Sequence, residues 1–319
     1  MKCLNRCGKR RVFIPLLFFF SLSSQSEPIV PITSPSGLNE REVQLGKRLF
    51  HSTELSRDNS ISCASCHKVG GGGDDDLPFA VGVDGQVGPI NSPTVLNSSL
   101  NAFQFWDGRA ATLEEQAEGP IHNPLEMGSS WQEVIEKLSG SSAWVDEFRE
   151  VYQDGITSVN IARAIATYER ALVTPNSPFD RYLQGNESAI EDQAKEGYRL
   201  FKRMGCVSCH QGQNVGGNMF QQFGIMGDYF RDRGSITEAD YGRFNVTGKE
   251  RDRYTFKVPG LRNVAQTAPY FHDGSAETLP DAIRTMARYQ LGRGITADQV
   301  RAIEAFLKSL SGQVREDLL

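Results

Sequence analysis

The sequence predicts a mainly α-helical protein composed of two similar domains in tandem. Apolar residues recur with helical spacing in several segments, a set of landmark residues occurs twice, and no long alternating strand pattern stands out. A chain of 319 residues is long enough for about two domains, each with its own core. The hydrophobic fraction of 39% and the charged fraction of 23% are ordinary for a globular protein, so they exclude a disordered or multi-span membrane chain.

The duplication is visible as segments that match between the two halves. Residues 46–50 (Gly-Lys-Arg-Leu-Phe) correspond to residues 197–201 (Gly-Tyr-Arg-Leu-Phe). Further landmarks keep one spacing in both copies: Pro93, Asn97, Asp107, Gly108, Ala110, Thr112 and Leu113 match Pro259, Asn263, Asp273, Gly274, Ala276, Thr278 and Leu279. We therefore predict an N-terminal domain at 27–180 and a C-terminal domain at 181–319.

The first 26 residues have the order of an export signal. A basic stretch is followed by the apolar run Val12–Phe20 and by small residues up to Ser26, where we expect cleavage and release into the periplasm. Cys3 and Cys7 precede the apolar run and would leave with the signal, so four cysteines remain. The formal net charge of -5 predicts an acidic surface and gives no reason to expect a nucleic-acid partner.

Helix signals account for most of the chain. Asn39 and Glu42 form a plausible capping box for a helix that runs to about Phe50, and Pro280 suits the first turn of another helix. Three more segments show helical spacing of apolar residues, which we interpret as core: 131–138, 161–172 and 300–310. An insertion around residues 224–252, found only in the second copy, is expected to form loops.

Each half contains one Cys-x-x-Cys-His motif. The motifs are Cys63-Ala64-Ser65-Cys66-His67 and Cys206-Val207-Ser208-Cys209-His210. Two thiols one short turn apart can bond the vinyl groups of a haem, and the following imidazole can bind the iron. A zinc site or a thiol redox pair is the alternative interpretation. The sequence thus predicts two cytochrome c-like domains, each with one covalently bound c-type haem ligated by His67 or His210.

The ligand opposite each histidine separates an electron carrier from a catalyst. For the second haem the candidates are Met204, Met219, Met226 and Met286. Met204 is too close to the attachment motif to reach the other face, whereas Met286 follows at a distance typical of a chain that returns over the haem. We predict Met286 as the ligand, with a core methionine as the alternative interpretation.

No methionine occupies the matching place near the first haem. Residues 120–128 (Pro-Ile-His-Asn-Pro-Leu-Glu-Met-Gly) stand there instead. A carboxylate such as Glu126, held above an open iron, could move a proton between the two oxygens of a peroxide. Glu126 could equally be an ordinary exposed glutamate, and Met127 could be a ligand that closes the site.

The combined motifs resemble the bacterial di-haem cytochrome c peroxidases over nearly the whole mature length. The resemblance rests on these stretches: 61–67, 88–97, 104–109, 126–127, 172–175, 268–272, Met286 and 290–292. In that family the N-terminal haem has a low potential and reduces hydrogen peroxide. The C-terminal His/Met haem has a high potential and receives electrons from a small cytochrome c or cupredoxin.

The resemblance also implies roles for individual residues. Glu126 would be the catalytic acid and base, and Trp106 would lie between the haems. One calcium ion at the domain interface would be held by Asn91, Thr267 and Pro269, largely through oxygen atoms. The family further implies a homodimer.

One position departs from the family pattern. Many members have a histidine in the loop before the Gly-Pro-x-Asn-x-Pro-Thr run, and it blocks the peroxide site until the other haem is reduced. Val83 stands there in this chain, so we expect the first haem to be open or water-bound in the ferric protein. His51 and His122 are rival ligands, with a surface or propionate contact as the other interpretation of His51, and we interpret His272 as structural.

Two further functions stay open at this point. An electron carrier with both irons closed would not bind cyanide or azide. A di-haem oxidase that matures a protein-derived cofactor, like the relative acting on methylamine dehydrogenase, is favoured by the missing loop histidine. That relative has a tyrosine on its second haem, so Met286 argues against this alternative.

Overall fold

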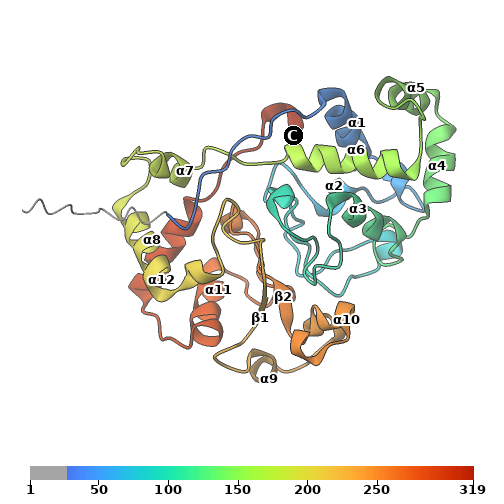
Figure 1. Ribbon diagram of the computed structural model, residues 1–319. Coiled ribbons are helices and arrows are strands. Elements are labelled where there is room, and N and C mark those ends of the chain that lie inside the picture. Colours follow the sequence, from blue (N-terminus) through green and yellow to red (C-terminus); the bar gives the residue numbers. More distant parts are fainter. Residues whose placement is uncertain (1–26) are drawn as a thin grey trace, which may run out of the picture.

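The computed structural model describes residues 27–319 and confirms the predicted mainly helical fold (Figure 1). The predicted export signal, with Cys3 and Cys7, lies outside the described residues. Helices α1 to α6 gather on one side of Figure 1, and α7, α8, α11 and α12 gather on the other. Within the described part, no helix is long and apolar enough to cross a membrane.

The first domain holds these helices: α1 (Glu40–His51), α2 (Cys63–Cys66), α3 (Leu113–His122), α4 (Trp131–Ser139), α5 (Ser142–Val151) and α6 (Ser158–Ala171). The second holds these: α7 (Pro178–Leu183), α8 (Asp192–Met204), α9 (Tyr229–Arg233), α10 (Phe244–Thr247), α11 (Leu279–Thr285) and α12 (Ala297–Lys308). Strands β1 (Phe220–Gln222) and β2 (Thr255–Lys257) pair antiparallel as the two strands of a small sheet.

The same helix crossing occurs in both domains and explains the duplicated glycines. A Cβ atom on Gly46 of α1 would lie 1.9 Å from the carbonyl oxygen of Ala164 in α6. A Cβ atom on Gly197 of α8 would lie 1.9 Å from the carbonyl oxygen of Ala302 in α12. Only glycine allows backbones to approach this closely, so each matched segment is a crossing point.

Local helix signals are partly confirmed. Asn39 caps α1 through a hydrogen bond from the backbone N–H of Arg41 to its side-chain oxygen at 3.1 Å. Glu42 does not complete the predicted capping box, because its carboxylate accepts a hydrogen bond from the Tyr152 hydroxyl at 2.7 Å. Pro280 lies in the first turn of α11 as predicted.

Each of the two helix groups packs around its own hydrophobic core. The first is built mainly from residues 43–172, and the second mainly from residues 179–310. The ends of the chain cross over, since Ile29 is buried in the second core and Leu318 in the first. Figure 1 shows the N-terminal blue segment and the C-terminal red segment running past each other between the domains. The domain limits 27–180 and 181–319 do not include this exchange and stay a proposal.

Hydrogen bonds fix both crossing ends. An Arg262 Nη2 group of the second domain donates to the carbonyl oxygen of Val30 at 3.0 Å. The Tyr168 hydroxyl of the first domain donates to the carbonyl oxygen of Leu318 at 2.7 Å. Each end of the chain therefore tethers one domain to the other.

A buried polar junction joins the duplicated halves. Asn97 and Asn263, which occupy matching positions, both have left-handed backbones, with φ values of 61° and 60°. The Asn97 amide donates to the Thr174 hydroxyl at 2.9 Å, and that hydroxyl donates to the Asn263 side-chain oxygen at 2.7 Å. One threonine thus connects the two copies of a repeated turn.

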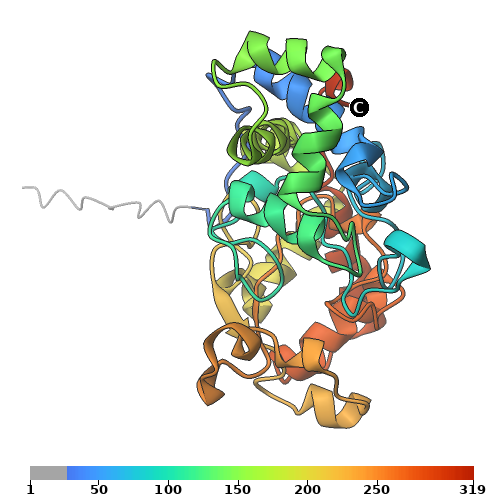
Figure 2. The ribbon, with the colours of Figure 1, turned by 90° about the vertical axis from the view of Figure 1, so that its right-hand side faces the viewer.

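The insertion at 224–252 is more ordered than the sequence suggested. It contains α9, α10 and two 3-10 turns, Glu238–Tyr241 and Glu250–Asp252, in place of loops alone. Buried aromatic residues around it form a cluster: Phe223, Tyr229, Phe230 and Phe256. These rings give the short elements a core, although no apolar periodicity marks them. Figure 2 shows this orange region below the green helices of the first domain.

Candidate haem-binding sites

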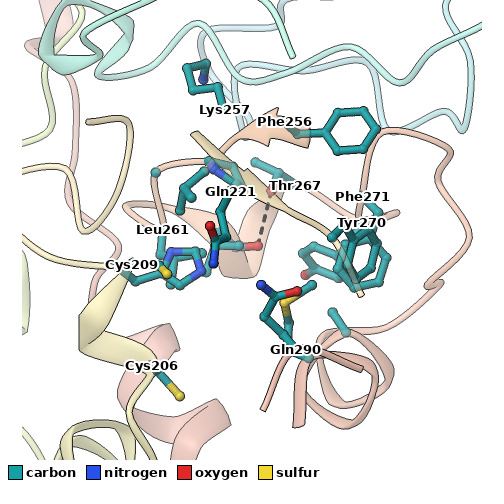
Figure 3. Close-up of a pocket in the computed structure, with 18 of the residues that line it drawn as sticks. Cys206, Cys209, Gln221, Phe256, Lys257, Leu261, Thr267, Tyr270, Phe271 and Gln290 are labelled. Atoms are coloured by element: carbon teal, nitrogen blue, oxygen red, sulfur yellow. Dashed lines mark hydrogen bonds between the residues drawn. The ribbon is translucent and has the colours of Figure 1, made fainter. Parts of the chain in front are cut away.

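A cavity of about 290 Å³ adjoins the second Cys-x-x-Cys-His motif. Cys206, Cys209 and His210 line one part of it, and Met286 lines it from the end of α11. In Figure 3 the two cysteines lie on one side of the cavity and Gln290 lies across from them. The predicted attachment residues and the predicted methionine therefore face one space.

The segment that carries Met286 is locally distorted. Helix α11 ends at Thr285, and Met286–Gln290 forms a π-helical turn. Such turns widen a helix and are frequent at functional sites. Of the other candidates, Met204 also lines the cavity, directly before the attachment motif, whereas Met226 is 61% exposed. Met286 as the iron ligand stays a prediction.

Both motif histidines have surroundings that suit metal binding. His67 Nδ1 lies 3.1 Å from the carbonyl oxygen of Gly73, and His210 Nδ1 lies 3.2 Å from that of Val215. A proton on Nδ1 in this bond leaves Nε2 free for iron. Burial lowers the pKa of both histidines, and that of His210 falls to about 4, so the imidazoles stay neutral at pH 7.

The aromatic support of the histidines is duplicated as well. Phe50 lies beside His67 with ring centroids 6.4 Å apart, and Phe201 lies beside His210 at 6.3 Å. Both phenylalanines belong to the matched segments at the ends of α1 and α8. The repeat seen in the sequence is therefore a repeat of the histidine environment.

The four cysteines do not resemble a zinc site or a redox pair. Burial raises the pKa of Cys63 to about 12 and that of Cys66 and Cys206 to about 11, so these thiols are protonated at neutral pH. Redox-active cysteines have lowered pKa values. Among residues 27–319, the one close group of three metal-binding side chains is Asp240, His272 and Asp273, which includes no cysteine. The residues present fit haem better than either alternative.

Glu126 lies in the turn that follows α3. Its Oε1 atom accepts a hydrogen bond from the Asn123 amide at 2.7 Å, and the side chain is only partly exposed. Burial raises the pKa of Glu126 above its ordinary value, opposed by the Asn123 hydrogen bond and by the charge of Arg109. A carboxyl group in this state can take up and release a proton closer to neutral pH.

Val83 packs directly on the Glu126 turn. The backbone N–H of Val83 donates to the carbonyl oxygen of Glu126 at 2.8 Å, and its side chain is 1% exposed. A Cβ atom on the neighbouring Gly82 would lie 2.2 Å from the carbonyl oxygen of Leu125, so glycine is required for this approach. An aliphatic residue thus packs on the turn that carries the predicted catalytic carboxylate.

The remaining ligand candidates of the first domain have other surroundings. Met127 is buried in the first core with 2% exposure. His51 is exposed, and its Nδ1 atom lies 2.9 Å from the carbonyl oxygen of Lys47. His122 is also exposed and packs edge-on against Trp131 at 5.6 Å. These contacts assign none of the three side chains to a haem site.

Trp106 lies at the boundary of the two domains. Its indole N–H donates to the carbonyl oxygen of Asn91 at 2.9 Å, and its own carbonyl accepts from the Lys257 backbone N–H at 2.8 Å. The predicted calcium residues Asn91, Thr267 and Pro269 line the same cavity as Trp106. The Asn91 amide nitrogen donates a hydrogen bond to the carbonyl oxygen of Leu77 at 2.8 Å. The side-chain oxygen of Asn91 therefore stays available for a cation.

Two features of this region were not predicted from the sequence: the partners that hold His272, which we interpreted as structural, and the cavity lysine Lys257. His272 is 2% exposed, and its Nε2 atom lies 2.7 Å from Asp240 Oδ1. Arg233 bonds both Asp240 and Asp273, so the insertion holds the turn around His272. Lys257, in β2, lines the cavity. The first copy has no counterpart of the insertion, so the repeat offered no signal for Asp240 or Arg233.

Comparison with known proteins adds independent support. Residues 40–188 match the family model described as di-haem cytochrome c peroxidase, and residues 194–311 match the model for cytochrome c. The chain is 47% identical to cytochrome c551 peroxidase of Nitrosomonas europaea, covering 90% of this chain and 85% of that protein. It is 50% identical to cytochrome c peroxidase Ccp of Escherichia coli, over 90% of this chain but 62% of that longer protein.

More distant similarity extends to a second group. The methylamine utilization protein MauG of Methylorubrum extorquens is 37% identical over 78% of this chain and 69% of that protein. The crystal structure of a MauG-like protein associated with microbial copper homeostasis superposes with a TM-score of 0.77 at 26% identity. That superposition covers 92% of this chain and 95% of the other.

Proposed function

Because this chain belongs to the family of bacterial di-haem cytochrome c peroxidases, we propose that it reduces hydrogen peroxide to water in the periplasm. Two electrons and two protons are consumed per peroxide, and the electrons come from a small donor protein such as a cytochrome c or cupredoxin. The observation that carries the proposal is the difference between the two sites. A partly buried carboxyl group follows the first site, whereas a thioether lines the second.

Each haem is held by residues of one domain. Cys63 and Cys66 attach the first haem, and His67 binds its iron. The second haem is attached by Cys206 and Cys209, with His210 and Met286 as its iron ligands: these four line one cavity. When bound, the haems would supply iron that can bind peroxide and exchange single electrons.

Glu126 moves the proton that peroxide cleavage requires. Its carboxylate accepts a proton from one peroxide oxygen and returns it to the other, so that water can leave. The raised pKa suits this exchange, and the Asn123 amide orients the Oε1 atom. Val83 contributes no ligand atom, which supports a first site that is open or water-bound before reduction.

Trp106 connects the two sites. Its hydrogen bonds to Asn91 and Lys257 reach both domains, which supports a role in electron transfer between the haems. A calcium ion held by Asn91, Thr267 and Pro269 would strengthen the same boundary, since all three line the cavity beside Trp106. A homodimer, as the family implies, completes the proposal.

A cofactor-maturing oxidase is the second candidate. It is favoured by Val83 and by the 37% identity to a methylamine utilization protein. Met286 argues against it. A protein that turns over peroxide with reduced cytochrome c as its sole donor is a peroxidase, whereas a maturing oxidase would turn over slowly under those conditions.

The decisive variant is Glu126→Gln, assayed by the oxidation of reduced cytochrome c with peroxide. General acid–base catalysis contributes roughly 10²- to 10⁴-fold, so we expect a loss of that size. Glu118→Gln is the matched control, because Glu118 is an exposed glutamate of the neighbouring helix α3. A Glu126→Gln protein with two haems and an unchanged rate would remove Glu126 from the mechanism.

A further inference from the structure

The cavity at the second haem site has an unbalanced charge. Among the described residues that line it, Lys257 and Arg262 are cationic, and none is an aspartate or glutamate. Asp180 neutralises the charge of Arg262, because the Arg262 Nη1 atom lies 2.8 Å from Asp180 Oδ1 and both side chains are fully buried. Lys257 has no ion pair or side-chain hydrogen bond to any residue of the described range 27–319. One cation therefore faces the cavity without an anion.

Burial makes this cation costly. Lys257 is 6% exposed, and burial lowers its pKa to about 8. A buried ammonium group without a counter-ion is strongly unfavourable, and proteins place such groups where a partner or ligand neutralises them. An apolar side chain at this place in β2 would avoid the cost. The lysine therefore indicates an anionic group inside the cavity.

Lys257 lies at the end of the cavity where the propionate groups of a haem are expected. Its strand, β2, is fixed by pairing with β1 and by the hydrogen bond from the Lys257 backbone to the Trp106 carbonyl. Figure 3 shows Lys257 at the end of the cavity remote from Cys206. In a haem the two propionates lie on the edge opposite the vinyl groups. Because Cys206 and Cys209 would fix the vinyl edge, the propionates would point toward the end where Lys257 stands (Figure 3).

We propose that Lys257 is the counter-ion of a propionate of the second haem and thereby raises the reduction potential of that haem. The inference rests on the proposed haem attachment and does not depend on peroxide turnover. Reduction adds one electron to the haem, so a nearby positive charge favours the reduced form. Without Lys257 the propionate charge would be uncompensated and would favour the ferric form. The lysine would therefore add to the difference in potential that Met286 creates.

The test compares substitutions at Lys257 in the full-length protein with both haems attached. Lys257→Gln and Lys257→Met remove the charge, and Lys257→Arg keeps it. Lys249→Gln is the matched control, because Lys249 is an exposed lysine of the neighbouring insertion. Haem content is measured first, by the absorbance of the pyridine complex. A redox titration followed by visible absorbance then gives the midpoint potential of each haem.

We expect both neutral variants to lower the potential of the second haem and to leave that of the first unchanged. At a fixed ambient potential the ferric-to-ferrous ratio of the second haem should rise about tenfold, which for one electron is a shift of about 59 mV. Lys257→Arg should change the ratio less than threefold, and Lys249→Gln should not change it. Loss of the second haem in both neutral variants but not in Lys257→Arg would equally support the ion pair.

Three results would overturn the proposal. The first is an unchanged second-haem potential in both neutral variants. The second is a shift confined to the first haem, which would assign the lysine to the other cofactor. The third is loss of the second haem in all three Lys257 variants, because a replacement that conserves charge should still bind the propionate. A protein with two haems but no peroxidase activity would contradict the proposed function and leave these readouts intact.

Discussion

The two domains share one scaffold and differ at the segment that follows a matched threonine. In both, a helix pair crosses at a glycine and a phenylalanine lies beside the motif histidine. Later in each domain a matched threonine, Thr112 or Thr278, caps a helix, α3 or α11. At the matched place eight residues after that threonine, the first domain has Pro120 and the second has Met286. The comparison teaches that the duplication preserved the surroundings of the two motif histidines, while one short segment distinguishes the two sites.

The structural consequence follows from the two side chains. Pro120 carries no atom that can bind iron, and α3 continues past it to His122 and the turn that holds Glu126. Met286 offers a thioether, and its helix changes to a π-helical turn there. A site with a carboxyl group and no close ligand suits catalysis, whereas a site closed by sulfur suits electron relay.

The largest expected effect comes from making the two sites alike. Met286→Ala removes the predicted sulfur ligand and should open the second iron, so the ferric protein should bind two equivalents of cyanide per chain where the native protein binds one. Optical titration with cyanide measures the stoichiometry. Met226→Ala, at a residue that is 61% exposed, is the control and should still bind one equivalent. One equivalent in the Met286→Ala protein would show that Met286 does not close the iron.

The second prediction tests whether the two helix crossings are structurally equivalent. Gly46→Ala and Gly197→Ala each place a methyl group 1.9 Å from a backbone oxygen, which cannot move away as a side chain can. Each should lower the free energy of unfolding by about 3 kcal/mol, the upper part of the range for overpacked cores. Denaturant unfolding of the holoprotein measures the loss. The exposed Gly294→Ala is a control, since nothing lies within 4 Å of its Cβ position.

Very unequal losses would break this comparison. If Gly46→Ala were strongly destabilising and Gly197→Ala were neutral, the two helix crossings would not be equivalent, and the duplicated sequence segment would have lost its structural meaning in one domain.

A third prediction concerns the junction between the copies. Thr174→Val removes the hydroxyl that joins Asn97 and Asn263 and leaves both buried amides short of a partner. Unfolding free energy should fall by about 1 to 2 kcal/mol, as for other unsatisfied buried polar groups. Thr174→Ser keeps the hydroxyl and should recover most of the loss. Equal stability of the Val and Ser variants would mean that the junction does not couple the domains.

The smallest effect expected is a displacement of the pH profile. Burial raises the pKa of Glu126 above its ordinary value of 4.5, and the deprotonated form accepts the peroxide proton. Activity should therefore decrease as the pH falls, with a midpoint above pH 4.5. Steady-state rates between pH 4 and 8 would locate the midpoint, and Glu126→Gln should abolish that limb. A midpoint at or below 4.5 would show that burial does not tune this carboxyl group.

Much of the scaffold could be predicted because its signals are local or repeated. Helical periodicity marked α4, α6 and α12, and the Cys-x-x-Cys-His motifs marked the attachment residues. The crossing glycines were visible as a repeat, although their contact with Ala164 and Ala302 was not. Such a contact depends on a helix more than 100 residues away in the chain.

Other features left no local signal. The exchange of the chain ends involves Ile29 and Leu318, single apolar residues in short segments without periodicity. Lys257 and Asp240 belong to the region around the insertion, for which the first copy offers no template. Glu126 was singled out by its place in the repeat and by family resemblance. Its contact with Val83 depends on a loop that returns from some 40 residues earlier.

Electron paramagnetic resonance of the fully oxidised holoprotein tests unequal coordination most directly. We expect one low-spin signal from the second haem, bound by His210 and Met286, and one high-spin or water-bound signal from the first haem beside Val83. Two low-spin signals and no high-spin signal in the fully oxidised protein, each from an iron with two strong protein ligands, would contradict this account.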